Sequence, residues 1–114
     1  MVQIPREPSG ADVRTAVVRS DGGIAMTTLF VRHEVADYAQ WRQVYDAFAP
    51  TQASLGVQDQ AVYQAIENPN DITVRHEFAT LEAAQAFTGS SELRAAMHDA
   101  GVEGAPTIWF TTQA

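Results

Sequence analysis

Histidine is the side chain of this sequence best suited to proton transfer near neutral pH, and two of its three histidines stand in nearly the same short phrase. The phrase reads VRHEV at residues 31–35 and VRHEF at residues 74–78. Successive side chains of a β-strand point to opposite faces, so each copy places its histidine on one face with apolar residues and its Arg and Glu on the other. His33 and His76 are therefore the candidate catalytic bases of the chain.

The composition limits the other chemistry available. The sequence contains no cysteine, which excludes disulfides, thiolate metal sites and cysteine nucleophiles. The third histidine, His98, has no His-x-x-His or Glu-x-x-His spacing, so no metal site is predicted and His98 is expected to be exposed. The residues themselves therefore favour chemistry by His, carboxylate, Arg, Tyr and Ser or Thr side chains without a metal.

The acidic balance of the chain bears on its partners. Seven Lys and Arg residues stand against 14 Asp and Glu residues, which gives a formal net charge of -7. No basic cluster is present to displace counterions from a polyanion, so nucleic-acid binding is not expected. No apolar run reaches the roughly 18–20 residues of a membrane span, and residues 1–25 lack a secretory signal pattern. A cytoplasmic protein with no membrane contact is the expectation.

The first copy of the phrase lies in a strand expected over residues 27–35, where β-branched and aromatic residues alternate. Asp37 follows as a helix cap. The helix presents aromatic side chains at helical spacing, which are expected to be mostly core: Tyr38, Trp41, Tyr45 and Phe48. Pro50 predicts an end or a kink of this helix near Ala49.

The second copy lies in an expected hairpin. Residues 60–67 and 72–78 predict strands, and the turn formers NPND at residues 68–71 predict the turn between them. Thr80 then caps a second helix that is interrupted by GSS at residues 89–91, where Ser90 or Ser91 caps a further segment. A last strand is expected over residues 107–112.

The chain divides into an N-terminal arm or hairpin extension, residues 1–25, and one domain, residues 26–114. Proline and glycine punctuate the first segment, and only residues 13–19 read as a strand. Either this segment is an arm, or residues 13–19 turn at DGG (residues 21–23) and pair with residues 24–30.

The element order of residues 26–114 is β-α-β-β-α-β, which predicts an α+β, ferredoxin-like domain with a four-stranded antiparallel sheet and both helical segments on one face. The last strand carries apolar side chains on both of its faces, in IWF at residues 108–110. We therefore expect the uncovered face to meet a second copy of the chain, whose sheet would close a barrel around a shared interior.

Charge matching predicts a register for the two strands that carry the phrase. If paired residue numbers sum to 109, Arg32 lies opposite Glu77, Glu34 lies opposite Arg75, and all four charges are compensated. The same register sets His33 opposite His76. The two histidines then form a pair on one face of the sheet, and the charged residues form a ladder on the other.

Which of these faces lines a pocket is left open by the sequence. If the more apolar face lies under the helices, the histidines lie there as core residues; the alternative places them in the pocket as general bases. Five further residues are candidates for binding a substrate: Phe30, Arg32, Tyr63, Arg75 and Trp109. Either arginine could hold an oxyanion or belong to a structural ion-pair network, and Tyr63 and Trp109 could line the pocket or lock the dimer.

The element order and four segments resemble the dimeric α/β barrel superfamily, specifically the small antibiotic biosynthesis monooxygenase-like proteins that include a group called cyclases. The segments are VRHEV-x-DY-x-x-W at residues 31–41, NPND at residues 68–71, EF at residues 77–78 leading into LEAA at residues 81–84, and SEL at residues 91–93 running to AGV at residues 100–102. The resemblance covers roughly residues 27–112.

The resemblance implies a homodimeric enzyme of the cofactor-independent monooxygenase or cyclase type, acting on a small aromatic or polyketide-like substrate in the barrel interior. A noncatalytic dimeric ligand-binding or accessory domain is the alternative. A haem-binding or haem-degrading protein is a third possibility, but the Asn-Trp-His set of such relatives has no counterpart, since Asn68 and Asn70 fall in the expected turn.

Overall fold

The computed structural model describes residues 17–18 and 24–114 of the 114-residue chain. The strands are β1 (Val17–Val18), β2 (Ile24–Ala25), β3 (Thr27–Val35), β4 (Asp59–Ala65), β5 (Asn68–Phe78) and β6 (Val102–Thr112). The helices are α1 (Tyr38–Ala47), α2 (Ala49–Ser54), α3 (Leu81–Thr88) and α4 (Ser91–Asp99). From β3 onward, strands and pairs of helices follow the predicted β-α-β-β-α-β order.

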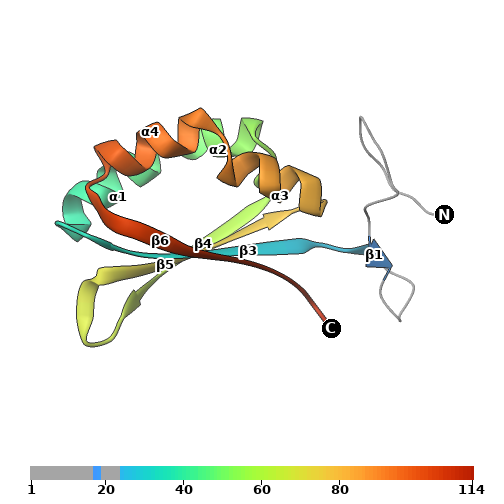
Figure 1. Cartoon of the computed structure of the whole chain (residues 1–114), viewed down its shortest axis with the longest axis horizontal. Coiled ribbons are helices and arrows are strands. Elements are labelled where there is room, and N and C mark those ends of the chain that lie inside the picture. Colours follow the sequence, from blue (N-terminus) through green and yellow to red (C-terminus); the bar gives the residue numbers. More distant parts are fainter. Residues whose placement is uncertain (1–16, 19–23) are drawn as a thin grey trace.

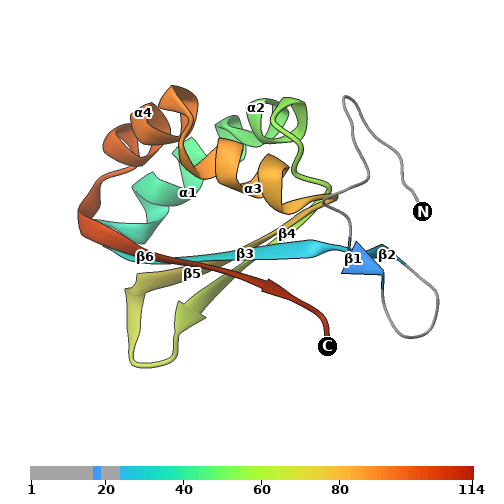
Figure 2. The ribbon, with the colours of Figure 1, turned by 45° about the vertical axis from the view of Figure 1, so that its right-hand side comes forward.

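A four-stranded antiparallel sheet in the order β4-β5-β3-β6 is the base of the fold. All four helices lie on one face of this sheet (Figure 1), and the turned view shows no element of the described chain over the opposite face (Figure 2). The predicted α+β, ferredoxin-like architecture is confirmed. Within the described ranges, no helix is long and apolar enough to cross a membrane.

The helix-covered face of the sheet is the apolar face that the alternation predicts. Alternate side chains of β3 and β5 are buried there: Leu29, Val31, His33, Val35, Ile72, Val74, His76 and Phe78. Trp41, Ala84, Phe87 and Leu93 close the core from the helices. Leu81, which helical spacing also directs inward, is instead 40% exposed.

The β4–β5 hairpin turns earlier than the sequence predicts. β4 ends at Ala65, which pairs with Asn68, so residues 66 and 67 form the turn and the NPND segment belongs to β5. These turn formers have partners inside the fold: the Asn70 side chain accepts a hydrogen bond from the backbone N–H of Tyr38 (2.9 Å), at the start of α1. Because this contact lies far away in sequence, local turn preference could not reveal it.

The helix boundaries follow the predicted caps. The Asp37 carboxylate accepts from the backbone N–H of Gln40, and the Thr80 hydroxyl accepts from that of Ala83. Pro50 lies in the first turn of α2, directly after the end of α1, where its missing N–H does not interrupt a helical ladder. At the second interruption the cap is Ser90, whose Oγ accepts from the backbone N–H of Leu93.

The predicted register of β3 and β5 is wrong by four residues. The observed pairs sum to 105, so Val31 faces Val74 and His33 faces Ile72 rather than His76. Arg32 forms its ion pair with Asp71, at 2.6 Å, and not with Glu77. Arg75 pairs with Glu77 on its own strand (2.6 Å) and with Asp59 on β4 (3.3 Å).

The predicted register failed because charge matching treated two strands in isolation. Asp59 comes from a third strand, and Asp71 comes from the segment assigned to a turn. Both registers have odd sums, so both keep the same side chains under the helices. The faces were therefore predicted correctly even though the pairing was not.

The predictions for residues 1–25 fall mostly outside the described residues. Residues 17–18 pair antiparallel with residues 24–25, through Val17 with Ala25 and Val18 with Ile24. The antiparallel direction of this short pairing is the one that the hairpin alternative predicts. The division of the chain at residue 25 stays a prediction.

The identity of the α4 cap can be tested by paired substitutions. Ser90→Ala removes the acceptor for the Leu93 N–H and is expected to lower the free energy of unfolding by about 1 kcal/mol. Ser91→Ala, at the next residue, removes only an exposed 3.4 Å contact with Glu92 and is expected to change it by less than half as much. Urea unfolding of both variants makes the comparison, and equal losses would contradict the assignment of Ser90 as the cap.

Candidate functional site

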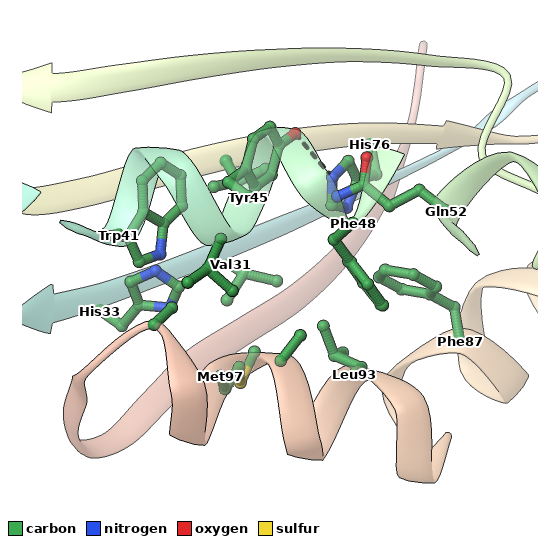
Figure 3. Close-up of a pocket in the computed structure, with 14 residues that line it drawn as sticks. Val31, His33, Trp41, Tyr45, Phe48, Gln52, His76, Phe87, Leu93 and Met97 are labelled. Atoms are coloured by element: carbon green, nitrogen blue, oxygen red, sulfur yellow. Dashed lines mark hydrogen bonds between the residues drawn. The ribbon is translucent and has the colours of Figure 1, made fainter. Parts of the chain in front are cut away.

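A cavity lies inside the single chain, between the helix-covered face of the sheet and the helices (Figure 3). Its volume is about 40 Å³, room for a few water molecules. The wall is almost entirely apolar; the side chains with polar atoms in it are His33, Trp41, Tyr45, Gln52 and His76. Both histidines of the repeated phrase therefore lie under the helices, as the first of the two alternatives expected. There they line a cavity within one chain, which is not the barrel interior expected between two copies.

His33 projects into this cavity from β3 without a polar neighbour. Its side chain is 7% exposed, and neither Nδ1 nor Nε2 has a hydrogen-bond partner among the described residues. Its closest ring contact is edge-on to Trp41, with 5.8 Å between centroids. Burial lowers the His33 pKa to about 4, and the Asp71 charge opposes this only in part. The imidazole is therefore neutral near pH 7.

His76 on β5 has one defined partner. Its Nε2 lies 3.1 Å from the Tyr45 hydroxyl, while Nδ1 has no partner within the described part of the chain. The ring is 3% exposed and stands edge-on to Phe87, with 5.2 Å between centroids. Burial, and to a smaller extent the charge of Arg75, lowers the His76 pKa to about 4. His76 is thus also neutral near pH 7.

Tyr45 connects the cavity to the edge strand of the sheet. Its hydroxyl donates to Oε1 of Gln60 on β4 (2.6 Å), and its ring lies parallel to that of His76, with a 2° interplanar angle. Burial raises the Tyr45 pKa to about 12, so the phenol keeps its proton near neutral pH. The sequence placed Tyr45 on the buried helix face but could not indicate this hydrogen bond, because residues 45, 60 and 76 are far apart in the chain.

The two histidines lie at different ends of the site. His33 faces Ile72 and His76 faces Leu29 across the same pair of strands. Four residues of β5 separate the two rows, which corresponds to about 13 Å along the strand. The predicted His33–His76 pair is therefore absent, and the imidazoles cannot act on one atom together. They can, however, contact opposite ends of one elongated ligand.

The five residues predicted to bind a substrate do not line the cavity. Phe30 and Trp109 stack on the opposite face of the sheet, with 5.3 Å between ring centroids, and Tyr63 is 52% exposed. Arg32 and Arg75 lie on that same face in their ion pairs. The structure therefore separates these residues from His33 and His76 by the thickness of the sheet.

Several cavity residues were not predicted as site residues. Gln52 on α2 is 3% exposed, and no pattern in the sequence distinguishes it from an exposed helical glutamine. Phe87 on α3 and Leu93 and Met97 on α4 are apolar residues that helical spacing directs inward, without marking them as site residues. Across residues 17–18 and 24–114, no three His, Cys, Asp or Glu side chains gather in a way that could hold a metal ion.

No protein-family model matches the sequence, and no curated protein matches it. Solved structures do share its fold. A candidate antibiotic biosynthesis monooxygenase from Bordetella bronchiseptica has a TM-score of 0.70 at 14% identity, covering 79% of this chain and 98% of that one. A second candidate, from Caulobacter crescentus CB15, has a TM-score of 0.64 at 18% identity, covering 79% and 91%.

SnoaB, a cofactor-independent oxygenase from Streptomyces nogalater, has a TM-score of 0.66 at 13% identity, covering 79% of this chain and 94% of its own. The chain therefore has the fold of the antibiotic biosynthesis monooxygenase-like proteins, which confirms the resemblance seen in the sequence. Identities this low establish the fold and leave the reaction open.

The buried neutral histidines predict a pH dependence of stability. The unfolded chain takes up protons near pH 6.5, whereas the folded chain takes them up only near the lowered pKa of about 4. Stability is therefore full above pH 6.5 and is lost as the pH falls from 6.5 toward 4. Between pH 7 and pH 5 the loss is about 2 kcal/mol for each histidine.

Urea unfolding at the two pH values measures this loss. His33→Gln and His76→Gln should each remove one histidine's share of the pH dependence. His98→Gln is the matched control, because its side chain is 90% exposed in the folded protein. If all three variants lose as much stability as the parent between pH 7 and pH 5, the buried neutral state of His33 and His76 is refuted.

Proposed function

We propose that this chain is a small-molecule enzyme of the cofactor-independent monooxygenase or cyclase type, acting on an aromatic or polyketide-like substrate in the cavity beneath the helices. The fold supports the class, since SnoaB shares it. The interior of the cavity supports the substrate, because aromatic and aliphatic side chains surround two neutral hydrogen-bonding rings. We further propose a cytoplasmic location.

The observation that carries this proposal is the set of three unpartnered imidazole nitrogens on two histidines that line an apolar cavity. In the described structure, His33 uses neither of its ring nitrogens and His76 uses only Nε2. A buried polar atom left without a partner costs about 1–3 kcal/mol, which a ligand with a hydroxyl or carbonyl group would recover. Two such rings facing one cavity are typical of a site that a ligand completes.

The chemistry follows from the charge state of the rings. A neutral imidazole can accept the proton of a phenol or of an activated carbon, leaving an anion that reacts with dioxygen or with an internal carbonyl. Although the pKa of each histidine is lowered to about 4 in the free protein, a substrate anion beside the new imidazolium favours its charged form. Substrate binding and proton transfer would therefore assist each other.

The small volume of the cavity predicts movement on binding. A fused aromatic ring system needs more space than about 40 Å³. The wall on the side of α4 consists of Leu93, Ala96 and Met97 from the helix and Ala100, which directly follows it. Two of these are alanines and one is an adaptable methionine, so a shift of α4 away from the sheet would displace one large core side chain, Leu93. We expect the ligand to enter by widening the site on this side.

Turnover of a panel of polycyclic phenols, followed by oxygen consumption and product absorbance, tests the function. We expect His33→Gln or His76→Gln to lower kcat by about 10²-fold or more while the far-UV circular dichroism stays unchanged. His98→Gln should turn over like the parent. Saturable binding of a phenol without turnover would favour the noncatalytic ligand-binding alternative, and absence of both binding and turnover would refute the cavity as a site for this class.

We also propose that the chain forms a homodimer through the uncovered face of the sheet. The stacked Phe30 and Trp109 rings lie there, with Trp109 39% exposed, and Ile108 and Phe110 leave apolar surface on the other side of the same strand. Large exposed aromatic groups next to each other are typical of an interface. A small domain also gains stability from burying such a face.

Sedimentation velocity at micromolar concentration tests the dimer. The parent is expected to sediment as a dimer, and Trp109→Glu as a folded monomer, because an unpaired carboxylate in an apolar interface is strongly unfavourable. Leu81→Glu is the control, since it places the same charge on a 40% exposed leucine on the helical side. A monomeric parent would contradict the proposal.

A further inference from the structure

The two buried histidines differ in one respect: a neighbouring side chain determines which ring nitrogen of His76 carries the proton, and no neighbour among the described residues does so for His33. The Tyr45 hydroxyl lies between Oε1 of Gln60 (2.6 Å) and Nε2 of His76 (3.1 Å). A phenol has one proton to donate, and Tyr45 donates it to Gln60, so toward His76 the phenolic oxygen can only accept. With the Gln60 amide oriented so that its oxygen faces Tyr45, the proton in that contact falls on Nε2 of His76. Tyr45 has no comparable contact with His33.

A neutral imidazole carries a proton on one nitrogen only. With Nε2 protonated, Nδ1 of His76 carries a free lone pair, and Nδ1 is the atom that has no partner among the residues described. For His33, neither nitrogen is engaged in the same way. His33 can therefore either donate to a ligand or accept from it, whereas His76 can only accept.

We propose that Tyr45 and Gln60 are positioning residues that make His76 the proton acceptor of the cavity, and that Tyr45 passes the surplus proton of His76 outward. This deepens the proposed function, because it assigns the base within the same site. His33 is left as the adaptable hydrogen-bonding group at the far end. The ligand is thereby required to present a hydroxyl group, or another proton donor, to Nδ1 of His76.

The surroundings of Tyr45 provide the outward route. A surface groove of about 300 Å³ shares two wall residues with the cavity, Tyr45 and Gln52. Gln60 and two carboxylates, Asp46 and Asp59, line the groove. The Tyr45 hydroxyl therefore stands between an apolar interior and a polar surface.

The transfer balances without any redox partner. The O–H bond of the ligand breaks as an N–H bond forms at Nδ1. The Nε2 proton passes to the Tyr45 oxygen, and the original Tyr45 proton leaves its hydrogen bond with Gln60 and passes to a solvent water molecule in the groove. One proton has then left the ligand and reached the solvent, Tyr45 is again a neutral phenol, and His76 is again neutral with its proton on Nδ1. When the ligand has left, exchange with solvent restores the Nε2–H form that Tyr45 favours.

The tautomer can be observed directly in the full-length protein without substrate. Nitrogen-15 NMR of histidine-labelled protein at pH 7 distinguishes Nε2–H from Nδ1–H imidazoles. We expect His76 to be mainly Nε2–H in the parent and to lose this preference in Tyr45→Phe, which keeps the ring and removes the hydroxyl. Tyr38→Phe is the matched control, since Tyr38 is on the same helix and stacks on Trp41 rather than on His76.

A parent His76 that is mainly Nδ1–H, or a Tyr45→Phe spectrum identical to the parent spectrum, would overturn the assignment of Tyr45. This readout needs no turnover, so it decides the tautomer even if no phenol proves to be a substrate and the proposed function fails. The two failures are therefore distinguishable.

The outward route has a kinetic test with the best phenol of the panel. Tyr45→Phe is expected to lower kcat by at least about tenfold and to leave the Kd of the ligand within about twofold, because the hydroxyl acts on the proton and not on the bound ring. Tyr38→Phe should change neither value. An unchanged kcat in Tyr45→Phe beside an active parent would overturn the route through Tyr45.

Discussion

The alternation of side chains along β3 and β5 is the constraint on which the rest of this structure depends. It puts a mainly apolar row under the helices and a mainly polar and charged row, which also contains Phe30, on the open face. The two histidines belong to the apolar row, so the helices that bury Leu29 and Phe78 also remove the imidazoles from water. Their neutrality near pH 7 is therefore a consequence of the same burial that forms the core.

This arrangement places imidazole nitrogens that need hydrogen-bond partners inside a small apolar core. A chain of this size buries a modest share of its surface, and each unpartnered polar atom reduces the margin of stability that remains. His76 meets half of its hydrogen-bonding capacity through Tyr45, while neither nitrogen of His33 has a hydrogen-bond partner among the described residues. The His33 end of the cavity therefore has more unpaired hydrogen-bonding atoms than the His76 end. This is the pattern expected of a site whose polar groups are paired by a bound ligand.

How far the sequence predicted the fold depended on how local each signal was. The element order, the caps at Asp37 and Thr80 and the buried face of each central strand all follow from spacing within a few residues, and all are confirmed. The strand register and the hairpin turn depended on residues distant in the chain. Arg75, which charge matching had paired with Glu34, forms an ion pair with Asp59 on a third strand. Asn70, which had been assigned to the turn, accepts a hydrogen bond from the backbone N–H of Tyr38.

Within the site, too, only the residues with a local sequence pattern could be predicted. His33 and His76 could be singled out because ionisable rings stand in otherwise apolar rows of a strand. The hydroxyl of Tyr45, the amide of Gln60 and the buried Gln52 could not, because three separate elements bring them together and none has a local pattern. The arginines and Trp109 were grouped with the histidines although period-two alternation already placed Arg32 and Arg75 on the other face.

The stacked aromatic column of α1 has an optical consequence. Tyr38, Trp41 and Tyr45 lie nearly parallel, with centroids 6.0 Å and 4.8 Å apart, so excitation of the tyrosines is passed efficiently to the indole at the cavity wall. The sequence has two tryptophans, and the other, Trp109, lies on the opposite side of the sheet against Phe30. The molecule thus carries a separate intrinsic fluorophore for each of its faces, and emission from one can change while the other stays constant.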